Sequence, residues 1–307
     1  MTEIETVAPE ECERVLAQVL GPPGAAGRAT RARARSFARY MSTCGLTWRA
    51  WRCRRGPRET ALVFLLFLPG QTAIMMMPAT AGCGVEGAEQ RRLVQAVLGQ
   101  LGEQRLSYVQ ALVEPEVAAQ RDLLVQTGFA HLTQLIYLRR SAAYPRFEPP
   151  APHEAVWLPY AAQRHDAFAN MLLATYEGSR DCPELSGLRT VNAVIASHQA
   201  AGPFDPALWE LAVVDGVHAG CILLSRLMDG ACLEVVYMGV AAPCRQRGVG
   251  SLLLRRALQH CRETGARELT AAVDCRNAPA RNLYARFGFE ATARREAYLY
   301  VWPKCRV

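Results

Sequence analysis

The chain has 307 residues, of which 50% are hydrophobic and 21% are charged. This length is enough for one large domain or two of ordinary size, and this composition excludes a disordered chain. The net charge is +7, yet Lys304 is the only lysine among 35 basic residues. A P-loop, which needs a Gly-Lys-Ser/Thr sequence, and Schiff-base catalysis by a lysine are therefore excluded.

Eleven cysteines are scattered from Cys12 to Cys305 without a CxxC pair. This pattern favours free thiols in a reducing cytosol over disulfides or a zinc site, and the six histidines show no ligand spacing, so we expect no metal. The amino terminus lacks a positive region followed by an apolar core. The longest apolar run, Ala61 to Pro69, is about half the length of a membrane helix. We expect a soluble, cytoplasmic protein with no membrane contact.

The densest basic stretch runs from Arg28 to Arg58 and alternates with Trp48 and Trp51. Its arginines are spread over an expected helix and an expected strand, which favours a solvated face over a nucleic-acid interface. We therefore expect no nucleic acid as partner. Salt-sensitive retention on DNA that depends on these arginines would indicate the opposite.

A proline-rich segment and a weak internal repeat divide the chain. Residues Ser141 to Pro152 carry four prolines within eight residues, which predicts an inter-domain linker. An offset of 160 residues aligns Ala73–Thr80 with Leu233–Val240, and Tyr108–Glu114 with Glu268–Asp274. The shared residues are mostly apolar, but the constant offset favours a duplication.

The second half shows a regular succession of apolar patterns. They predict a short strand at 155–160, helices over 161–176 and 187–200, strands at 208–214, 218–227 and 232–240, a helix to about 264, a strand at 268–274, a helix over 278–286 and a final pair of strands from Phe287 to Val301. Asp215-Gly216 and Asp229-Gly230 are hairpin turn signals. The expected fold class is α/β, α+β layered, with a mostly antiparallel sheet.

A glycine-containing segment joins the strand ending near Val240 to the following helix. Consecutive backbone N–H groups from Arg245 to Ser251 converge at a helix amino end, where an anion is favoured. Gly248 and Gly250 leave room for a diphosphate, and Arg245 and Arg247 add positive charge. Alone, this pattern is also that of a tight turn into a helix.

Two separated motifs identify a family. The Arg-x-x-Gly-x-Gly pattern at Arg245–Gly250, followed by Asn277, Leu283-Tyr284 and Gly288-Phe289, resembles the GNAT superfamily of N-acetyltransferases. The resemblance covers the second half of the chain, where the order of strands and helices from Val156 to Val301 also follows the family. It implies a twisted, mostly antiparallel sheet flanked by helices.

The resemblance also implies acetyl-CoA, or another acyl-CoA, as co-substrate and an amine as acceptor. In the family, the fourth and fifth strands splay apart and the pantetheine pairs with the fourth strand like an added strand. The residues expected to bind it are Met238, Gly239 and Val240, and those expected to bind the diphosphate are Arg245, Gln246, Arg247, Gly248, Val249, Gly250 and Ser251.

The resemblance places two further residues beside the cofactor. Tyr284 stands where the family commonly has the tyrosine that protonates the departing thiolate, and a phenol is protonated at neutral pH. The alternative is a tyrosine that only packs its helix on the sheet. Asn277 is expected to bind the cofactor chain or to cap the next helix.

Glu234 is the candidate general base, eleven residues before Arg245 in a strand that resembles histone-type members of the family. Strand alternation predicts Glu234, Val236 and Met238 on one face and Val235 and Tyr237 on the other. The alternative is an exposed glutamate on the sheet surface.

The loop between the first two helices of the second half sets acceptor choice in the family. Here Tyr176, Glu177 and Asp181, with Glu184 also available, are expected to meet a cationic amine, and an ordinary acidic loop is the alternative. No residue in this loop identifies a substrate.

The first half lacks the functional residues. At the offset of 160, Gly248 and Gly250 meet Ala88 and Gln90, and Tyr284 meets Leu124. We therefore expect two tandem GNAT-type domains, a degenerate one at residues 1–140 and a catalytic one at 153–307, joined by the linker at 141–152. A monomeric pseudo-dimer or a weak homodimer is expected.

The predicted function is an acyl-CoA-dependent N-acyltransferase. It would transfer acetyl from acetyl-CoA to a primary amine of a small molecule or protein by direct attack on the thioester. The alternative is a non-catalytic acyl-CoA sensor or scaffold, for which the degenerate half would be the argument.

Overall fold

The computed structural model describes residues 3–21, 27–81, 87–102, 106–142, 154–227 and 230–302. The chain divides into two compact units. Unit 1 comprises Met1–Leu132 and Arg295–Val307, and unit 2 comprises Thr133–Arg294. The expected linker lies outside the described residues except for Ser141 and Ala142.

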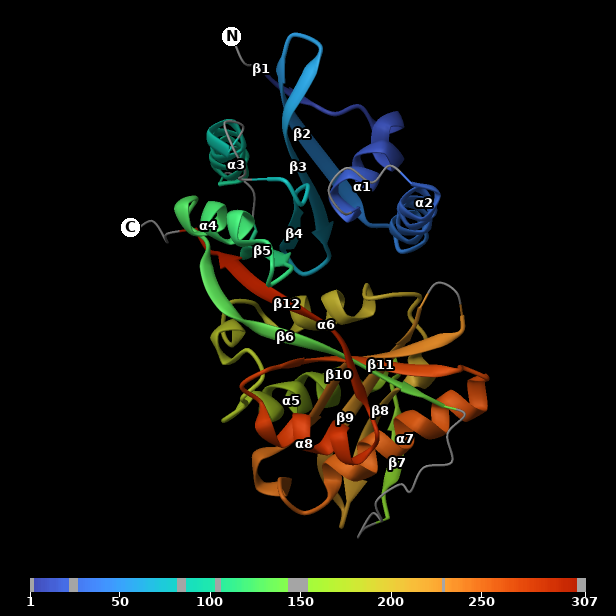
Figure 1. Cartoon of the computed structure of the whole chain (residues 1–307). Helices are drawn as coiled ribbons and strands as arrows, with labels where there is room; N and C mark the ends of the chain where they lie inside the picture. The colour runs from blue at the N-terminus through green and yellow to red at the C-terminus, as the bar shows by residue number, and fades with distance from the viewer. Residues whose placement is uncertain are drawn as a thin grey trace. The chain divides into compact units, whose positions relative to one another are not determined.

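Unit 1 is a sheet with helices on both faces. Its strands are β1 (Glu3–Thr6), β2 (Thr47–Arg55), β3 (Arg58–Leu68), β4 (Thr72–Met76) and β5 (Tyr108–Val113), and its helices are α1 (Cys12–Leu20), α2 (Arg28–Thr43), α3 (Gly87–Leu101) and α4 (Ala118–Gln126). The strand order is β1-β2-β3-β4-β5-β12. Helices α1 and α2 lie on one side of the sheet and α3 and α4 on the other (Figure 1).

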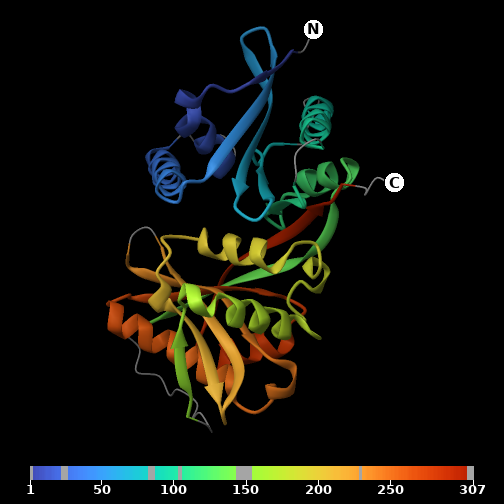
Figure 2. The ribbon, with the colours of Figure 1, turned by 180° about the vertical axis from the view of Figure 1, so that it is seen from behind.

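Unit 2 repeats this layered arrangement. Its strands are β7 (Val156–Pro159), β8 (Trp209–Val214), β9 (Val217–Arg226), β10 (Cys232–Val240) and β11 (Glu268–Asp274), and its helices are α5 (His165–Tyr176), α6 (Val191–Gln199), α7 (Val249–Thr264) and α8 (Ala278–Arg286). The strand order is β6-β11-β10-β9-β8-β7, with β10 and β11 parallel. Helices α7 and α8 cover the near face in Figure 1, and α5 and α6 cover the face that is near in Figure 2.

The last strand of each half belongs mainly to the other unit. From Thr133 onward, β6 (Ala130–Ser141) is part of unit 2, where it pairs antiparallel with β11. From Arg295 onward, β12 (Glu290–Tyr300) is part of unit 1, where it pairs antiparallel with β5. Each unit therefore completes its sheet with a strand from the other half of the sequence.

The expected pair of strands from Phe287 to Val301 is wrong, because this segment forms the single strand β12. The segment Glu290–Tyr300 contains no glycine, proline, asparagine or aspartate, so it offers no turn that could fold it back on itself. The antiparallel neighbour of β11 is supplied by β6 instead.

The two halves share their architecture. The bounds of α8 are those of α4 shifted by 160 residues, and β5 and β11 begin 160 residues apart at Tyr108 and Glu268. The mixed α/β fold with two related halves, predicted from the weak repeat, is confirmed.

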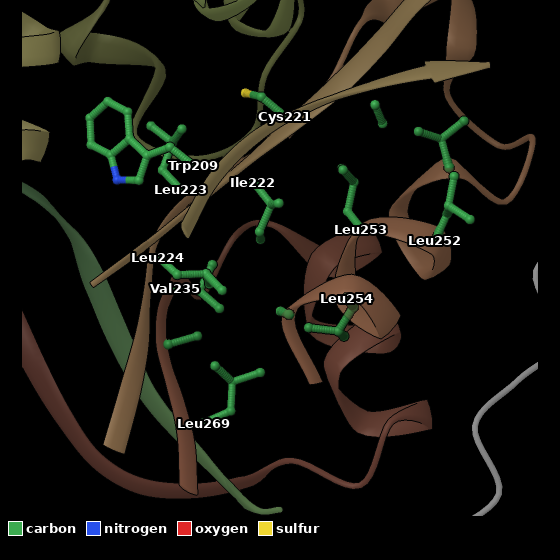
Figure 3. Packing of buried hydrophobic residues seen from close by; sticks show 14 of the residues in the cluster. Trp209, Cys221, Ile222, Leu223, Leu224, Val235, Leu252, Leu253, Leu254 and Leu269 are labelled. Carbon is green, nitrogen blue, oxygen red and sulfur yellow. The ribbon is translucent and has the colours of Figure 1, made fainter. Parts of the chain in front are cut away.

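Helix α7 anchors one face of the sheet in unit 2. It follows Gly248 at a φ of 86° and ends at Gly265 at a φ of 72°, left-handed conformations that glycine adopts without strain. Leu253 and Leu254 are fully buried and lie on the same side of the strands as Val235, whereas Trp209 and Leu223 lie on the other side (Figure 3).

Candidate active site

Strands β10 and β11 separate halfway along their length. They are paired in parallel from Cys232 and Glu268 to Val235 and Ala271. Beyond this point β10 continues to pair with β9, and β11 continues to pair with β6. The splay that the resemblance implied is therefore present. Beyond Val235, the edge of β10 that faces β11 has no paired strand among the described residues, so its backbone groups are available for other hydrogen bonds.

A β-bulge lies where the strands separate. The register between β10 and β9 shifts between Val235 and Tyr237, so Val236 is the extra residue. Directly opposed residues on neighbouring strands point to the same face. Val235 opposes Leu224, whereas Tyr237 opposes Leu223, which lies on the other side of the sheet (Figure 3).

The predicted alternation of β10 is therefore wrong. Glu234 opposes Ser225, so it points away from Val235 and shares its face with Tyr237. Met238 opposes Ile222 and points to the face of α7. A bulge inserts one residue into a strand and reverses the faces beyond it, which the residue pattern alone did not reveal.

Met238, Gly239 and Val240 occupy the separated end of β10. Gly239 is required for packing, because a Cβ there would lie 2.7 Å from the Cβ of Thr175 on α5. Helix α5 thus approaches β10 at a position where only glycine fits. The glycine keeps the separated end of β10 against this helix.

The loop after β10 brings free amides together. Gln246 has a φ of 61° and Gly248 a φ of 86°, so two left-handed residues turn the chain into α7. The amide of Leu252 is the first to donate within the helix, to the carbonyl of Gly248 at 3.1 Å. Within the part of the chain that the structure describes, the amides of Val249, Gly250 and Ser251 make no such bonds, as expected in a first helical turn.

Gly250 serves helix packing in addition to any ligand. A Cβ at this position would lie 3.1 Å from a methyl carbon of Leu283 on α8. The two helices that border the separated strands are therefore close to each other at Gly250.

The two arginines of the loop differ in their surroundings. The guanidinium of Arg245 donates to the carbonyls of Val240 at 3.1 Å, Gly178 at 3.2 Å and Thr175 at 2.9 Å. It braces the C-terminal end of α5 against the end of β10, a favourable place for a cation. Arg247 is exposed and pairs with Asp215 at 3.2 Å, so its charge is accessible from solvent.

Tyr284 is buried in α8. Its ring packs edge-on against Phe289, with centroids 5.0 Å apart. Burial raises the pKa of the Tyr284 hydroxyl, and the nearby charge of Asp181 raises it further. The hydroxyl therefore stays protonated at neutral pH, and Tyr284 packs the helix while keeping a neutral phenol.

Glu234 is half-buried on β10. Burial raises the pKa of its carboxyl group. Among the residues that the structure describes, no hydrogen-bond or ion-pair partner of this carboxylate is found. A part-buried carboxylate with a raised pKa has the proton affinity that a general base needs.

Asn277 and Asp181 lie at the start of α8. Asn277 is the N-cap residue, and its side-chain oxygen accepts from the amide of Ala280 at 3.3 Å. Its side chain also hydrogen-bonds Asp181. Asp181 remains exposed, yet desolvation by the surrounding protein raises its pKa, the combination expected of a carboxylate in a concave surface.

Aromatic side chains lie where β10 begins to separate from β11. The ring of Tyr237 packs edge-on against Tyr176, the last residue of α5, with centroids 5.9 Å apart, and lies 5.4 Å from the ring of His198. Its hydroxyl is 2.7 Å from the Thr175 hydroxyl. Burial lowers the pKa of His198 to about 4, so this imidazole is neutral at physiological pH. Glu177 follows Tyr176 as an exposed residue.

In unit 1, the position that corresponds to the separated end of β10 is occupied by a side chain of unit 1. The Gln120 amide of α4 donates to the carbonyls of Met77 and Pro78, which correspond to Tyr237 and Met238 at the offset of 160. Gln120 is buried. The backbone that follows β4 is therefore closed by Gln120.

The start of α3 in unit 1 is equally unsuited to an anion. Glu89 is buried there and pairs with Arg55. Gln90, which takes the place of Gly250, bonds the amide and the carbonyl of Leu62, each at 3.0 Å. A carboxylate in the first turn would repel a diphosphate.

The described residues offer neither a metal-binding group nor a membrane-spanning helix. No group of three or more His, Cys, Asp or Glu side chains that could hold a metal ion occurs among them. None of the helices formed by these residues is long and apolar enough to cross a membrane.

Residues 179–289 match the model of the Acetyltransferase (GNAT) family. A mycothiol acetyltransferase of Clavibacter michiganensis subsp. michiganensis (strain NCPPB 382) is 30% identical over 227 residues, which cover 73% of this chain and 70% of that protein. The chain therefore belongs to the GNAT acetyltransferase family, and it is an acyltransferase enzyme.

Further similarities cover part or all of the chain. A putative ribosomal protein bS18 alanine N-acetyltransferase of Bacillus subtilis (strain 168) is 32% identical over 84 residues, 27% of this chain and 54% of that protein. A GCN5-related N-acetyltransferase from Sphaerobacter thermophilus has a TM-score of 0.64 at 18% identity, covering 98% of this chain and 95% of that one. A tandem GNAT protein from the clavulanic acid biosynthesis pathway has a TM-score of 0.58 at 16% identity, covering 99% and 100%. Both halves therefore have the GNAT fold.

Sequence reasoning missed several residues of the site. Tyr237 was assigned to the wrong face because the bulge was not visible. Thr175 and His198 lie on α5 and α6 with ordinary helical spacing, which gave no signal. Asp274 at the end of β11 could have been noticed as a carboxylate that terminates an apolar strand.

Proposed function

We propose that unit 2 binds acetyl-CoA between the separated ends of β10 and β11 and transfers its acetyl group to a primary amine. The observation that carries the proposal is the unpaired edge of β10 leading into the free amides of Val249 to Ser251. An extended amide chain can add to such an edge as a strand would. A diphosphate suits the helix amino end that follows.

The acetyl-transfer chemistry is assigned to three side chains. Glu234 takes one proton from the incoming ammonium group, directly or through water, because its carboxylate has a raised pKa. The neutral amine nitrogen then attacks the thioester carbonyl carbon, and as the carbon–sulfur bond breaks the nitrogen loses a second proton to water. The Tyr284 hydroxyl, which its raised pKa keeps protonated, gives its proton to the departing thiolate and recovers one from solvent. Asp181 holds the positive charge of the incoming ammonium group.

The acceptor proposed is a small-molecule amine. The mycothiol acetyltransferase covers 73% of the chain, whereas the ribosomal protein alanine acetyltransferase matches only 27%. The exposed carboxylate of Asp181 and the ring of Tyr176 at the loop after α5 favour a cationic group beside an aromatic surface. A protein amino terminus is the second candidate acceptor.

A steady-state assay tests the proposal. CoA release from acetyl-CoA is measured with a panel of glucosamine, spermidine and a pentapeptide that begins with alanine. Tyr284→Phe is expected to lower kcat by about 10²–10⁴-fold, the usual contribution of a general acid, without changing the Kd of acetyl-CoA. Tyr160→Phe is the matched control, because the Tyr160 hydroxyl bonds His165 at 2.9 Å outside the proposed site. Equal turnover of both variants would remove Tyr284 from the mechanism.

A further inference from the structure

The loop between α5 and α6 is tied to the end of β11 by a reciprocal pair of hydrogen bonds. The amide of Cys182 donates to the Asp274 carboxylate at 3.0 Å. In return, the amide of Asp274 donates to the Asp181 carboxylate at 3.0 Å. Two aspartates thus each bind the backbone of the opposite segment, which fixes the position of one against the other.

Ionic contacts extend this connection. Arg276 donates to the Asp274 carboxylate at 2.7 Å and to Glu184 in the loop at 2.6 and 3.0 Å. A guanidinium with two carboxylate partners gives fixed geometry as well as attraction. Asp274 is fully buried, with 0% of its surface exposed, so its negative charge depends on these donors.

A strand from the first half of the sequence contributes a donor. The Thr133 hydroxyl, on the part of β6 that belongs to unit 2, donates to the Asp274 carboxylate at 2.6 Å. Thr133 is itself buried, with 2% exposed. Hydrogen bonds from Arg276 and Thr133 lower the pKa of Asp274 to about 2, although burial alone would raise it.

The loop is held in a conformation that it would not adopt freely. Cys182 has a φ of 44° and a ψ of 56°, the left-handed region that disfavours a residue with a Cβ. Such strain persists only where the surrounding contacts impose it. One such contact is the hydrogen bond that the Cys182 amide donates to the Asp274 carboxylate.

We propose that Asp274 is a positioning residue that, through Cys182 and Arg276, holds the loop so that Asp181 faces the acceptor amine. This inference rests on the proposed function, because it assigns Asp181 to the acceptor. Asp274 acts through the loop and touches neither the amine nor acetyl-CoA. It therefore determines affinity for the acceptor and leaves the affinity for acetyl-CoA unchanged.

The test compares variants of the full chain. In Asp274→Asn, one oxygen that accepts from Cys182, Arg276 or Thr133 is replaced by a donor. In Thr133→Val, the 2.6 Å bond to Asp274 and the weaker 3.8 Å contact with the Cys275 sulfur are removed from a residue of similar shape, so this variant tests the connection between the loop and β11 even if Asp274→Asn does not fold. Glu290→Gln is the control, because Glu290 is an exposed carboxylate on β12 of the same unit.

Two readouts are used. KM and kcat are measured with the amine of the panel that gives the highest turnover, and acetyl-CoA binding is measured by calorimetry. We expect KM for the amine to rise by about tenfold or more in Asp274→Asn, and by less in Thr133→Val, while the Kd of acetyl-CoA stays within about twofold. An unchanged KM in both variants, or a Kd that weakens in parallel with KM, would overturn the proposal.

Hydrogen exchange provides a readout that needs no acceptor. The amides of Cys182 and Asp274 are expected to be protected in the wild type and to exchange faster in both variants but not in Glu290→Gln. If the wild type fails to bind acetyl-CoA, the proposed function is wrong, and this exchange pattern still tests whether Asp274 holds the loop. Equal exchange of these amides in the wild type and all variants would contradict the proposed role of Asp274.

Discussion

Gly239→Ala tests whether the close approach of α5 to β10 builds the site. An added Cβ would lie 2.7 Å from the Cβ, 2.8 Å from the methyl carbon and 2.9 Å from the hydroxyl oxygen of Thr175. Two of these are carbon–carbon contacts, so α5 must move by about 1 Å to restore the usual separation of roughly 3.5–4.0 Å. Overpacking of this kind costs about 1–3 kcal/mol.

The displacement has a functional consequence because of what Thr175 binds. Its hydroxyl is 2.7 Å from that of Tyr237, and its carbonyl accepts from Arg245. Movement of α5 therefore weakens both the hydrogen bond between the Thr175 and Tyr237 hydroxyls and the hydrogen bond from Arg245 to the Thr175 carbonyl. We expect weaker acetyl-CoA binding together with lower stability.

The assays are thermal unfolding and acetyl-CoA calorimetry. With about 2–4 °C per kcal/mol for a unit of this size, Tm is expected to fall by about 2–12 °C. Gly99→Ala in α3 is the control, because a Cβ there meets nothing within 4 Å and alanine favours a helix by about 0.5–1 kcal/mol. An unchanged Tm and Kd in Gly239→Ala would refute the reasoning.

Three further predictions concern separate parts of the chain. Glu210→Gln should lower the free energy of unfolding by about 3–5 kcal/mol, because buried Glu210 pairs with Arg256 at 2.6 Å and His260 at 2.8 Å. Burial alone would raise the pKa of Glu210, but these partners hold it below its ordinary value. The stability that Glu210 contributes is complete above about pH 4.3, the ordinary pKa of a glutamate in the unfolded chain. Denaturant titrations of the wild type should show this stability being lost as the pH falls through the lower pKa of the folded protein. A wild type that shows no such loss would contradict the account. Burial raises the pKa of Glu234, so kcat/KM should fall with decreasing pH around an apparent pKa above about 4.3. This dependence should disappear in Glu234→Gln. If it persists in that variant, the general base is another residue. Gln120→Ala should destabilise the protein by about 1–3 kcal/mol, since the carbonyls of Met77 and Pro78 lose their donor, and should create no second acetyl-CoA site in calorimetry.

The layered architecture could be read from local patterns. Periodic apolar residues and the two hairpin turn signals identified most elements of unit 2, and the offset of 160 identified the second copy. Each of these signals arises within a short stretch of chain. The exchange of β6 and β12 depends on pairing between distant segments, which no local pattern determines.

Two local conformations near the candidate site were predictable, but the geometry around them was not. Gly248 and Asn277 stand where their conformations require them, as a left-handed turn and a helix cap. The bulge at Val236 reversed the faces of β10, and the guanidinium of Arg245 donates to carbonyls. Both features depend on tertiary contacts with β9 and α5, which the sequence of β10 does not specify.

The central claim is that one acetyl-CoA binds per chain, at the loop of Gly248 in unit 2. Calorimetric titration of the wild-type chain with acetyl-CoA tests it most directly, beside Gly248→Glu, which adds a negative charge and a side chain at a φ of 86°. We predict one site in the wild type and none in the variant. Two sites, or a single site that survives in Gly248→Glu, would contradict the account.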